Sequence, residues 1–189
     1  MKNLIAMALL LVGVQSHAAY EDVALNVVKS VAPKAVSPLA VLNWKVNDNA
    51  DYSLKGGMLN GTLHMFVREE TNKGYWVQQD VDLGFMGKQK VEAHYDKSNG
   101  QVLELLINGE KQQLPSQDDM EVVESRRESV TVPKGTFDAI YLKLRDKKKN
   151  QDSQLWVNPS QIPIAGMLKT VSATQMGDMT LELTNFLKQ

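Results

Sequence analysis

Few residues of this chain have the type and spacing that metal binding or covalent catalysis requires. The absence of cysteine excludes a thiol nucleophile, a disulfide framework and a cysteine-rich zinc site. His64 and His94 lie on the polar faces of two predicted strands, where they could be metal ligands across neighbouring strands or two exposed side chains. No third residue accompanies them at ligand spacing, which favours exposed histidines. We therefore expect no metal site.

Two carboxylates share one face of a predicted strand. Asp80 and Asp82 are two residues apart, and paired carboxylates can act as acid and base when burial separates their pKa values. Gln78 is on the same water-facing side, so solvated charge is the better interpretation. A hydrolase acting on envelope material would need Asp80, Asp82 or His94 to lie in a cleft.

Sequence motifs of common enzyme classes are absent. The chain has no Gly-x-Ser-x-Gly elbow, no Gly-x-x-x-x-Gly-Lys phosphate loop and no His-Glu-x-x-His zinc pair. We therefore expect a protein that is not an enzyme and needs no cofactor.

Two predicted loops are unusually apolar. Gly84-Phe85-Met86-Gly87 places an aromatic residue and a methionine between glycines, and the segment from Pro159 to Met167 contains Ile162 and Ile164. Exposed apolar loops often contact a membrane or a partner protein, so Ile162, Ile164 and Met167 are candidates for such a contact. Alternatively, both loops fold back and cap the core.

Bulky, adaptable side chains could line an apolar pocket. The same residues could equally form an ordinary core. The candidates for the pocket lining are Trp44, Met65, Trp156 and Ile164, with Phe85 and Met86 at the mouth.

Length and composition are those of one globular domain. The chain has 189 residues, 43% of them hydrophobic, and a formal net charge of −1. The chain has no basic excess to release phosphate counterions, so we expect no nucleic acid among its partners.

The N-terminal segment has the pattern of a secretory signal peptide. Lys2 precedes an apolar run from Leu4 to Val14, and Ala18 offers a cleavage position. The run is too short to span a bilayer as a permanent helix. We expect residues 1–18 to be removed on export to a bacterial periplasm, with peripheral membrane contact at most.

Residues 19–40 are predicted to form one helix and a linker. Val23, Val27 and Val31 recur at helical spacing, and Pro33 ends the pattern.

From residue 41 to residue 189 the periodicity predicts a single antiparallel β domain. Tyr75, Val77 and Val81 alternate with polar residues, as half-buried strands do. The pattern repeats in about nine or ten segments, separated by turn sequences such as Asn108-Gly109. We expect a curved antiparallel sheet or incomplete barrel with one N-terminal helix. Other alternating segments begin near Leu42, Leu63, Val91, Leu103, Glu121, Phe137, Ser153 and Met179.

A motif succession in the C-terminal half resembles a group of uncharacterised exported bacterial proteins. It reads V-P-x-G-T-F at 132–137, W-x-x-P at 156–159 and P-x-x-G-x-x-K at 163–169. That group is similar in fold to lipoprotein carriers and receptors of the LolA and LolB type. The resemblance implies a strongly curved sheet whose concave side is closed by a helix or loop, and in the carriers that side holds acyl chains. It carries over no catalytic residue.

The expected function is non-catalytic binding or carrying of an apolar, lipid-like ligand, or of a lipidated protein, in the periplasm. Burial of an acyl chain would supply about 0.8 kcal/mol per CH₂. The alternative is an interaction module with a solid core, whose edge or Pro159–Met167 loop docks another envelope protein.

Overall fold

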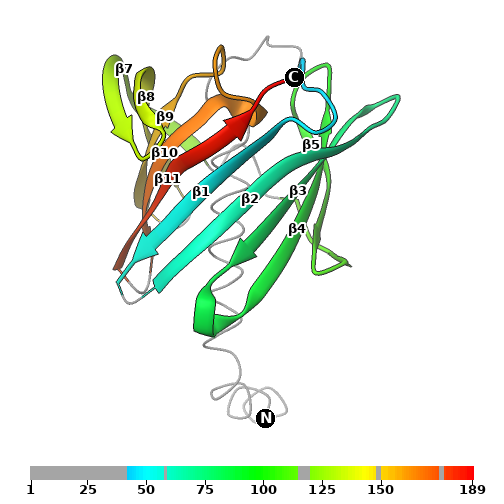
Figure 1. Ribbon diagram of the computed structural model, residues 1–189, viewed down its shortest axis with the longest axis horizontal. Coiled ribbons are helices and arrows are strands. Elements are labelled where there is room, and N and C mark those ends of the chain that lie inside the picture. Colours follow the sequence, from blue (N-terminus) through cyan, green and yellow to red (C-terminus); the bar gives the residue numbers. More distant parts are fainter. Residues whose placement is uncertain (1–41, 58, 115–119, 148–149, 175–176) are drawn as a thin grey trace.

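The computed structural model describes residues 42–57, 59–114, 120–147, 150–174 and 177–189, which form one open, curved antiparallel sheet (Figure 1). It has eleven strands in the order β6-β5-β4-β3-β2-β1-β11-β10-β9-β8-β7. Their bounds are β1 Asn49–Gly56, β2 Leu59–Glu70, β3 Gly74–Asp82, β4 Lys88–Asp96, β5 Val102–Ile107, β6 Glu110–Lys111, β7 Met120–Val132, β8 Gly135–Asp146, β9 Gln151–Val157, β10 Met167–Thr174 and β11 Gly177–Leu187. Among the described residues, two short 3₁₀ helices, η2 (Gly84–Met86) and η4 (Ile164–Gly166), interrupt the connections.

The sheet consists of two meanders joined in the middle. Strands β1 to β6 follow one another in space, as do β7 to β11, and the pairing of β1 with β11 joins the two sets. The free edges of the sheet are therefore β6 and β7.

The predicted curved antiparallel sheet is confirmed, and its strand count is corrected. The sheet has eleven strands where nine or ten were expected, because β1, β6 and β10 were not recognised as strands. The predicted signal peptide at 1–18 and the predicted helix and linker at 19–40 lie outside the described residues. Among the residues that are described, no helix is long and apolar enough to cross a membrane.

The alternating segment that begins at Leu42 is not a strand, contrary to expectation. Lys45 donates its backbone N–H to the Asp48 carboxylate at 2.9 Å, and Asn47 has a left-handed φ of 73°. This turn keeps the segment out of the sheet. Leu42 and Trp44 are nevertheless buried in the core, so their apolar character is explained by packing.

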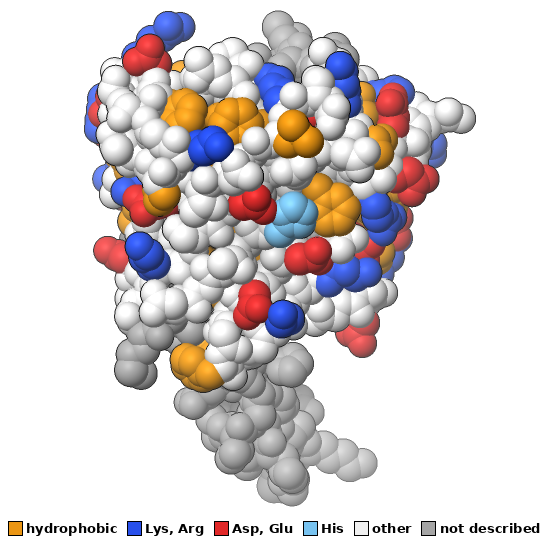
Figure 2. Space-filling view, in the orientation of Figure 1, with side chains coloured by type: hydrophobic (Ala, Val, Ile, Leu, Met, Phe, Trp, Pro, Cys, Tyr) orange, Lys and Arg blue, Asp and Glu red, His pale blue; other side chains and the backbone are white. Residues whose placement is uncertain are grey.

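Alternation along the strands gives the sheet a buried inner face and an exposed outer face. On the inner face, Met65 lies opposite Ala50 and Gln79. One residue earlier, His64 lies opposite Asp51 and Asp80 on the outer face. Figure 2 shows the outer face as a mixed surface on which neither sign of charge dominates.

The apolar segment from Pro159 to Met167 caps the core. Ile162, Ile164 and Met167 are at most 1% exposed, and η4 contacts β2. The segment closes on itself where Asn158 N–H donates to the Gly166 carbonyl at 2.7 Å. The expectation of an exposed apolar loop is therefore corrected, because these side chains leave no surface for a membrane or a partner.

Candidate ligand site on the inner face

The inner face of β1 to β4 combines a fully buried apolar surface with an aromatic cluster at one end. Met65 has no exposed surface. The Trp44 ring lies 5.8 Å from that of Tyr75 and 5.4 Å, edge-on, from that of Tyr95. Such contacts hold the Trp44 segment against the sheet although it is not a strand.

Two glutamine side chains interrupt this apolar surface. Gln79 is 0% exposed and Gln89 is 6% exposed. Within the described part of the chain, the Gln79 Nε2 and Oε1 atoms and the Gln89 Oε1 atom have no hydrogen-bond partner. Each unpaired polar group costs about 1–3 kcal/mol of folding free energy. A ligand with a hydrogen-bonding group would remove that cost.

The register of β3 and β4 brings the two glutamines close together. Gln79 lies opposite Val91, and Gln89 lies opposite Val81. They are therefore diagonal neighbours on adjacent strands, about 7–8 Å apart in the backbone and within reach of one ligand group. Each has an apolar residue directly opposite, so no protein side chain in those positions competes for the amides.

Two buried tyrosines on the same face differ in hydrogen bonding. Tyr52 donates its hydroxyl to the Met167 carbonyl at 3.0 Å and so joins the sheet to the capping segment. The Tyr95 hydroxyl finds no hydrogen-bond partner among the residues that the structure describes. Burial raises the pKa of both phenols further above physiological pH.

The structure brings together some of the predicted lining residues and separates others. Trp44, Met65 and Ile164 belong to one buried cluster. Trp156 follows Leu155 in β9 and so faces the other way, with its ring 5.1 Å from that of Tyr141. It donates its indole N–H to Glu128 at 2.6 Å. Trp156 is therefore on the outer face.

The two residues predicted at the pocket mouth lie in η2, between β3 and β4. Phe85 is 82% exposed, whereas Met86 is partly buried against the core. Phe85 is the most exposed of the large hydrophobic residues that the structure describes.

The histidines do not meet. His64 pairs with Asp51, with 2.5 Å between Nδ1 and Oδ1, whereas His94 contacts Thr71 Oγ1 at 3.0 Å and stacks on Trp76. In the register, His64 lies opposite Asp80, and His94 lies opposite Trp76, so the two occupy different rows. Over the described ranges, no group of three or more His, Cys, Asp or Glu side chains could hold a metal ion.

The paired carboxylates are solvated. Asp80 accepts a hydrogen bond from Gln78 at 2.9 Å. The backbone N–H of Gly84 and the ammonium of Lys88 hold the pKa of Asp82 below its usual value. Neither carboxylate lines the polar cleft described next.

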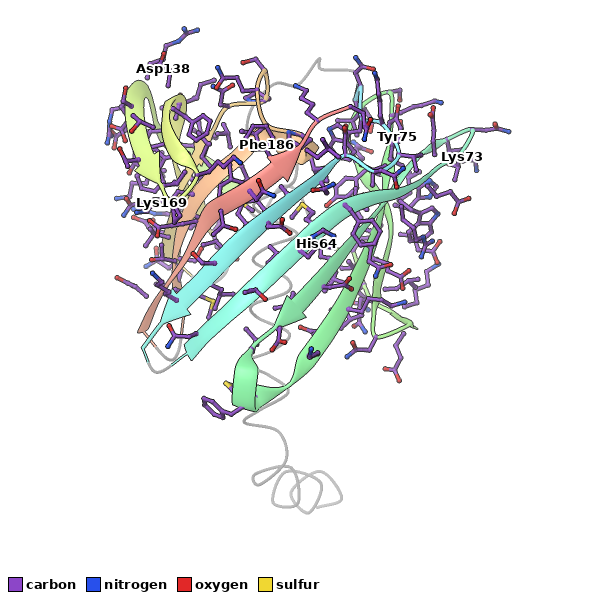
Figure 3. The ribbon with its side chains drawn as sticks, in the orientation of Figure 1. His64, Lys73, Tyr75, Asp138, Lys169 and Phe186 are labelled. Carbon is purple, nitrogen blue, oxygen red and sulfur yellow. The ribbon has the colours of Figure 1, made fainter. Side chains whose placement is uncertain are left out.

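A polar cleft of about 680 Å³ lies between the β7–β8 hairpin and the turn after β9. Figure 3 places Asp138, one of its lining residues, at the β7 side of the sheet and Tyr75 at the opposite side. The lining residues are Arg127, Glu128, Ser129, Asp138, Ala139, Ile140, Val157, Asn158, Pro159, Ser160 and Gln161.

Gln79, Gln89 and Tyr95 are not among the candidates predicted from the sequence, although the strand periodicity places them on the inner face. Once Gln78 and Asp80 face water, the alternation must place Gln79 inward. An amide side chain at a position that the alternation assigns to the buried face departs from the hydrophobic pattern, and it therefore marks a candidate functional residue.

Comparisons with known proteins give similarity of fold. No family model matches the chain, and no curated protein matches it. A hypothetical protein from Chlamydia trachomatis has 12% identity and a TM-score of 0.50, covering 79% of this chain and 91% of its own. A protein from Bacteroides fragilis, described as exported with a YmcC-like fold, has 12% identity and a TM-score of 0.43, covering 79% of this chain and 100% of its own. MucB of Pseudomonas aeruginosa, solved in complex with MucA, has 14% identity and a TM-score of 0.46, covering 82% of this chain and 56% of its own. The first of these shows the fold alone, and the resemblance to LolA and LolB stays a prediction.

Proposed function

We propose that this chain is a non-catalytic binding protein of the bacterial envelope whose inner face holds a ligand with an apolar body and a neutral hydrogen-bonding group. The observation that carries the proposal is the pair Gln79 and Gln89, buried in an apolar surface with unpartnered amide atoms. Native proteins rarely bury polar groups without a partner, so each such group calls for an explanation.

The chemistry of an amide narrows the ligand class. Gln79 offers two N–H donors and a carbonyl acceptor and carries no charge. An ionised ligand group would meet Met65, Val91 and Val81 as the directly opposite neighbours, and burying such a charge without a counter-ion is costly. A neutral ester or amide linked to an acyl chain satisfies both the amides and the apolar surface. Acyl lipids and lipidated proteins have this chemistry.

The site supports binding better than catalysis. Around Gln79 and Gln89, the directly opposite residues are apolar, and the phenol of Tyr95 is held neutral by burial. A general acid or base must change its protonation state near the working pH, which neither an amide nor this phenol does. The predicted signal segment at 1–18 supports a location in the envelope.

The test compares two neighbouring glutamines that face opposite ways. Gln79→Met keeps the side-chain length and removes the inner amide, whereas Gln78→Met makes the same change on the outer face. Each protein is purified from a bacterial periplasm and analysed by native mass spectrometry and organic extraction. We expect an acyl-containing ligand on the wild type and on the Gln78 variant, and less of it on the Gln79 variant. Equal occupancy in both variants would refute the role of the amide.

A second candidate function, docking of another envelope protein, is favoured by a different observation. The sheet ends on one side in β6, which has two residues, and on the other in β7, which has thirteen. A long open edge is a place where a partner strand can pair.

A further inference from the structure

Strand β7 is the longer of the two edge strands of the sheet. Within the described part of the chain, β7 pairs with β8 on one side and with no strand on the other. An edge strand exposes unpaired N–H and C=O groups, and proteins commonly limit this exposure by keeping edge strands short. Strand β6 follows that rule, whereas β7 does not.

On one face of β7 a single guanidinium is paired with two carboxylates. Arg126 forms ion pairs with Glu124 and Glu128, and its guanidinium carbon lies 3.8 Å from the centre of the Tyr141 ring. Glu128 also accepts the indole N–H of Trp156, and this hydrogen bond and Arg126 lower its pKa. These three groups leave one unbalanced negative charge, so this face does not favour a carboxylate in an incoming strand, and selection for a carboxylate has to come from the other face.

The other face of β7 carries a second arginine, Arg127. Arg127 points to the opposite side from Arg126 because side chains alternate. It lines the polar cleft, and among the described residues no carboxylate forms an ion pair with it. The cleft also contains Asp138, which accepts a hydrogen bond from Ser129 at 3.2 Å, and Glu128, which is already engaged.

An added strand would place one residue directly beside Arg127. Residues directly opposite on adjacent antiparallel strands have Cβ atoms about 4.5–5.5 Å apart, and their charges then matter. A carboxylate in that position pairs with the guanidinium, whereas a cation is repelled. Asp138 lies on β8, which pairs with β7 on the side away from the incoming strand. It is therefore farther from the incoming residue than Arg127 is.

Exposed apolar residues at the start of β7 add a second contact. Val122 and Val123 are 47% and 46% exposed, next to an irregularity in the pairing between Val122 and Glu124. A partner segment with apolar residues at that end would bury them.

We propose that β7 binds an extended segment of another protein as an added strand, and that Arg127 selects a segment with a carboxylate opposite it. The proposal rests on the second candidate function, protein docking, and is independent of the inner-face ligand. Two hydrogen bonds of Lys134 hold the tip of the β7–β8 hairpin against β11. Its backbone N–H donates to the Leu183 carbonyl at 3.1 Å, and its ammonium donates to Asn185 Oδ1 at 2.7 Å.

The experiment uses the purified protein and two synthetic peptides of about ten residues, a length suited to one strand. Both alternate threonine and valine, and they differ only in a central glutamate or lysine. We expect the glutamate peptide to bind about tenfold more tightly, a difference that corresponds to about 1.4 kcal/mol. Binding should also slow hydrogen exchange of the backbone amides of residues 121–131. Fluorescence anisotropy and hydrogen-exchange mass spectrometry measure the two effects.

A matched pair of variants assigns the selectivity to one edge. Arg127→Glu should reverse the preference between the peptides, and Lys111→Glu, on the β6 edge, should leave it unchanged. Equal affinity of the wild type for both peptides, or no binding of either, would overturn the proposal. So would a dimer in sedimentation that Arg127→Glu dissociates, because the edge would then belong to a second copy. None of these results changes the ligand mass found on the inner face, so failure of this proposal is distinguishable from failure of the main function.

Discussion

Gln79 on β3 and Gln89 on β4 are diagonal neighbours on the buried face of the sheet, and three of their amide atoms have no hydrogen-bond partner. In the ligand-free protein these unpaired amide atoms lower the free energy of unfolding. A ligand that forms hydrogen bonds with them would remove this loss. This relationship connects stability and binding, because removing the amide should improve the first and weaken the second.

The first prediction concerns the stability of the ligand-free protein. Gln79→Met should raise the free energy of unfolding by about 1 kcal/mol or more, because an unpaired buried amide is replaced by an apolar side chain of similar length. Gln78→Met, on the outer face, should change it by about 0.5 kcal/mol or less. Urea denaturation of protein stripped of lipid measures both. A less stable Gln79 variant would mean that the amide is satisfied in solution.

The second prediction compares two buried phenols. Tyr52→Phe removes the hydroxyl that donates to the Met167 carbonyl and should cost about 1–2 kcal/mol. Tyr95→Phe removes a hydroxyl without a partner and should be neutral or stabilising. The same denaturation experiment distinguishes them, and equal effects would contradict the assigned hydrogen bond.

The third prediction concerns pH. Arg145 and Lys143 hold the pKa of Asp152 well below its usual value. A depressed folded-state pKa gives stability that is present above the unfolded-state value near 3.9 and is lost as the pH falls toward the folded-state value.

Asp152→Asn should therefore lower the Tm at pH 7 and have a smaller effect at pH 3. Asp80→Asn, at an exposed position beside Gln78, is the control. Thermal scans at the two pH values measure the difference. A Tm loss at pH 3 as large as that at pH 7 would show that charge is not the cause.

The fourth prediction tests the cap over the core. Gly166 has a φ of 74°, and a Cβ there would lie 2.3 Å from Pro159 N. Gly166→Ala should therefore destabilise by more than about 2 kcal/mol, because strain and overlap add.

Gly109 is the matched control for the cap. It also has a positive φ, 86°, but a Cβ there would meet nothing within 4 Å. Gly109→Ala should cost about 1 kcal/mol, the backbone strain without the overlap. Similar losses in the two variants would refute tight packing of the segment.

The sequence predicted the strands better than it predicted the loops. Alternation found β3 and β4 because one face of each is buried, and Asn108-Gly109 marked a turn in which both residues have positive φ. The segment at Leu42 alternates in the same way, yet the Asp48 carboxylate and the left-handed Asn47 turn it out of the sheet. Periodicity does not register such local hydrogen bonds.

The candidate site was only partly predictable. The strand pattern places Met65 on the inner face, whereas the size of Trp156 does not show which face of β9 it occupies. Ile162 and Ile164 were open to two interpretations because an apolar loop can either cap a core or reach outward, and only the packing decides. The β7 edge depends on strand order, which sequence alone does not give.

The central claim is that the inner face binds an acyl-containing ligand through the amide of Gln79. The most direct measurement is native mass spectrometry, with organic extraction, of the wild-type protein, Gln79→Met and Gln78→Met purified from a periplasm. The account predicts a stoichiometric acyl-containing mass on the wild type and Gln78→Met that falls sharply on Gln79→Met. A clean ligand-free mass for the wild type, or an unchanged ligand mass on Gln79→Met, would contradict it.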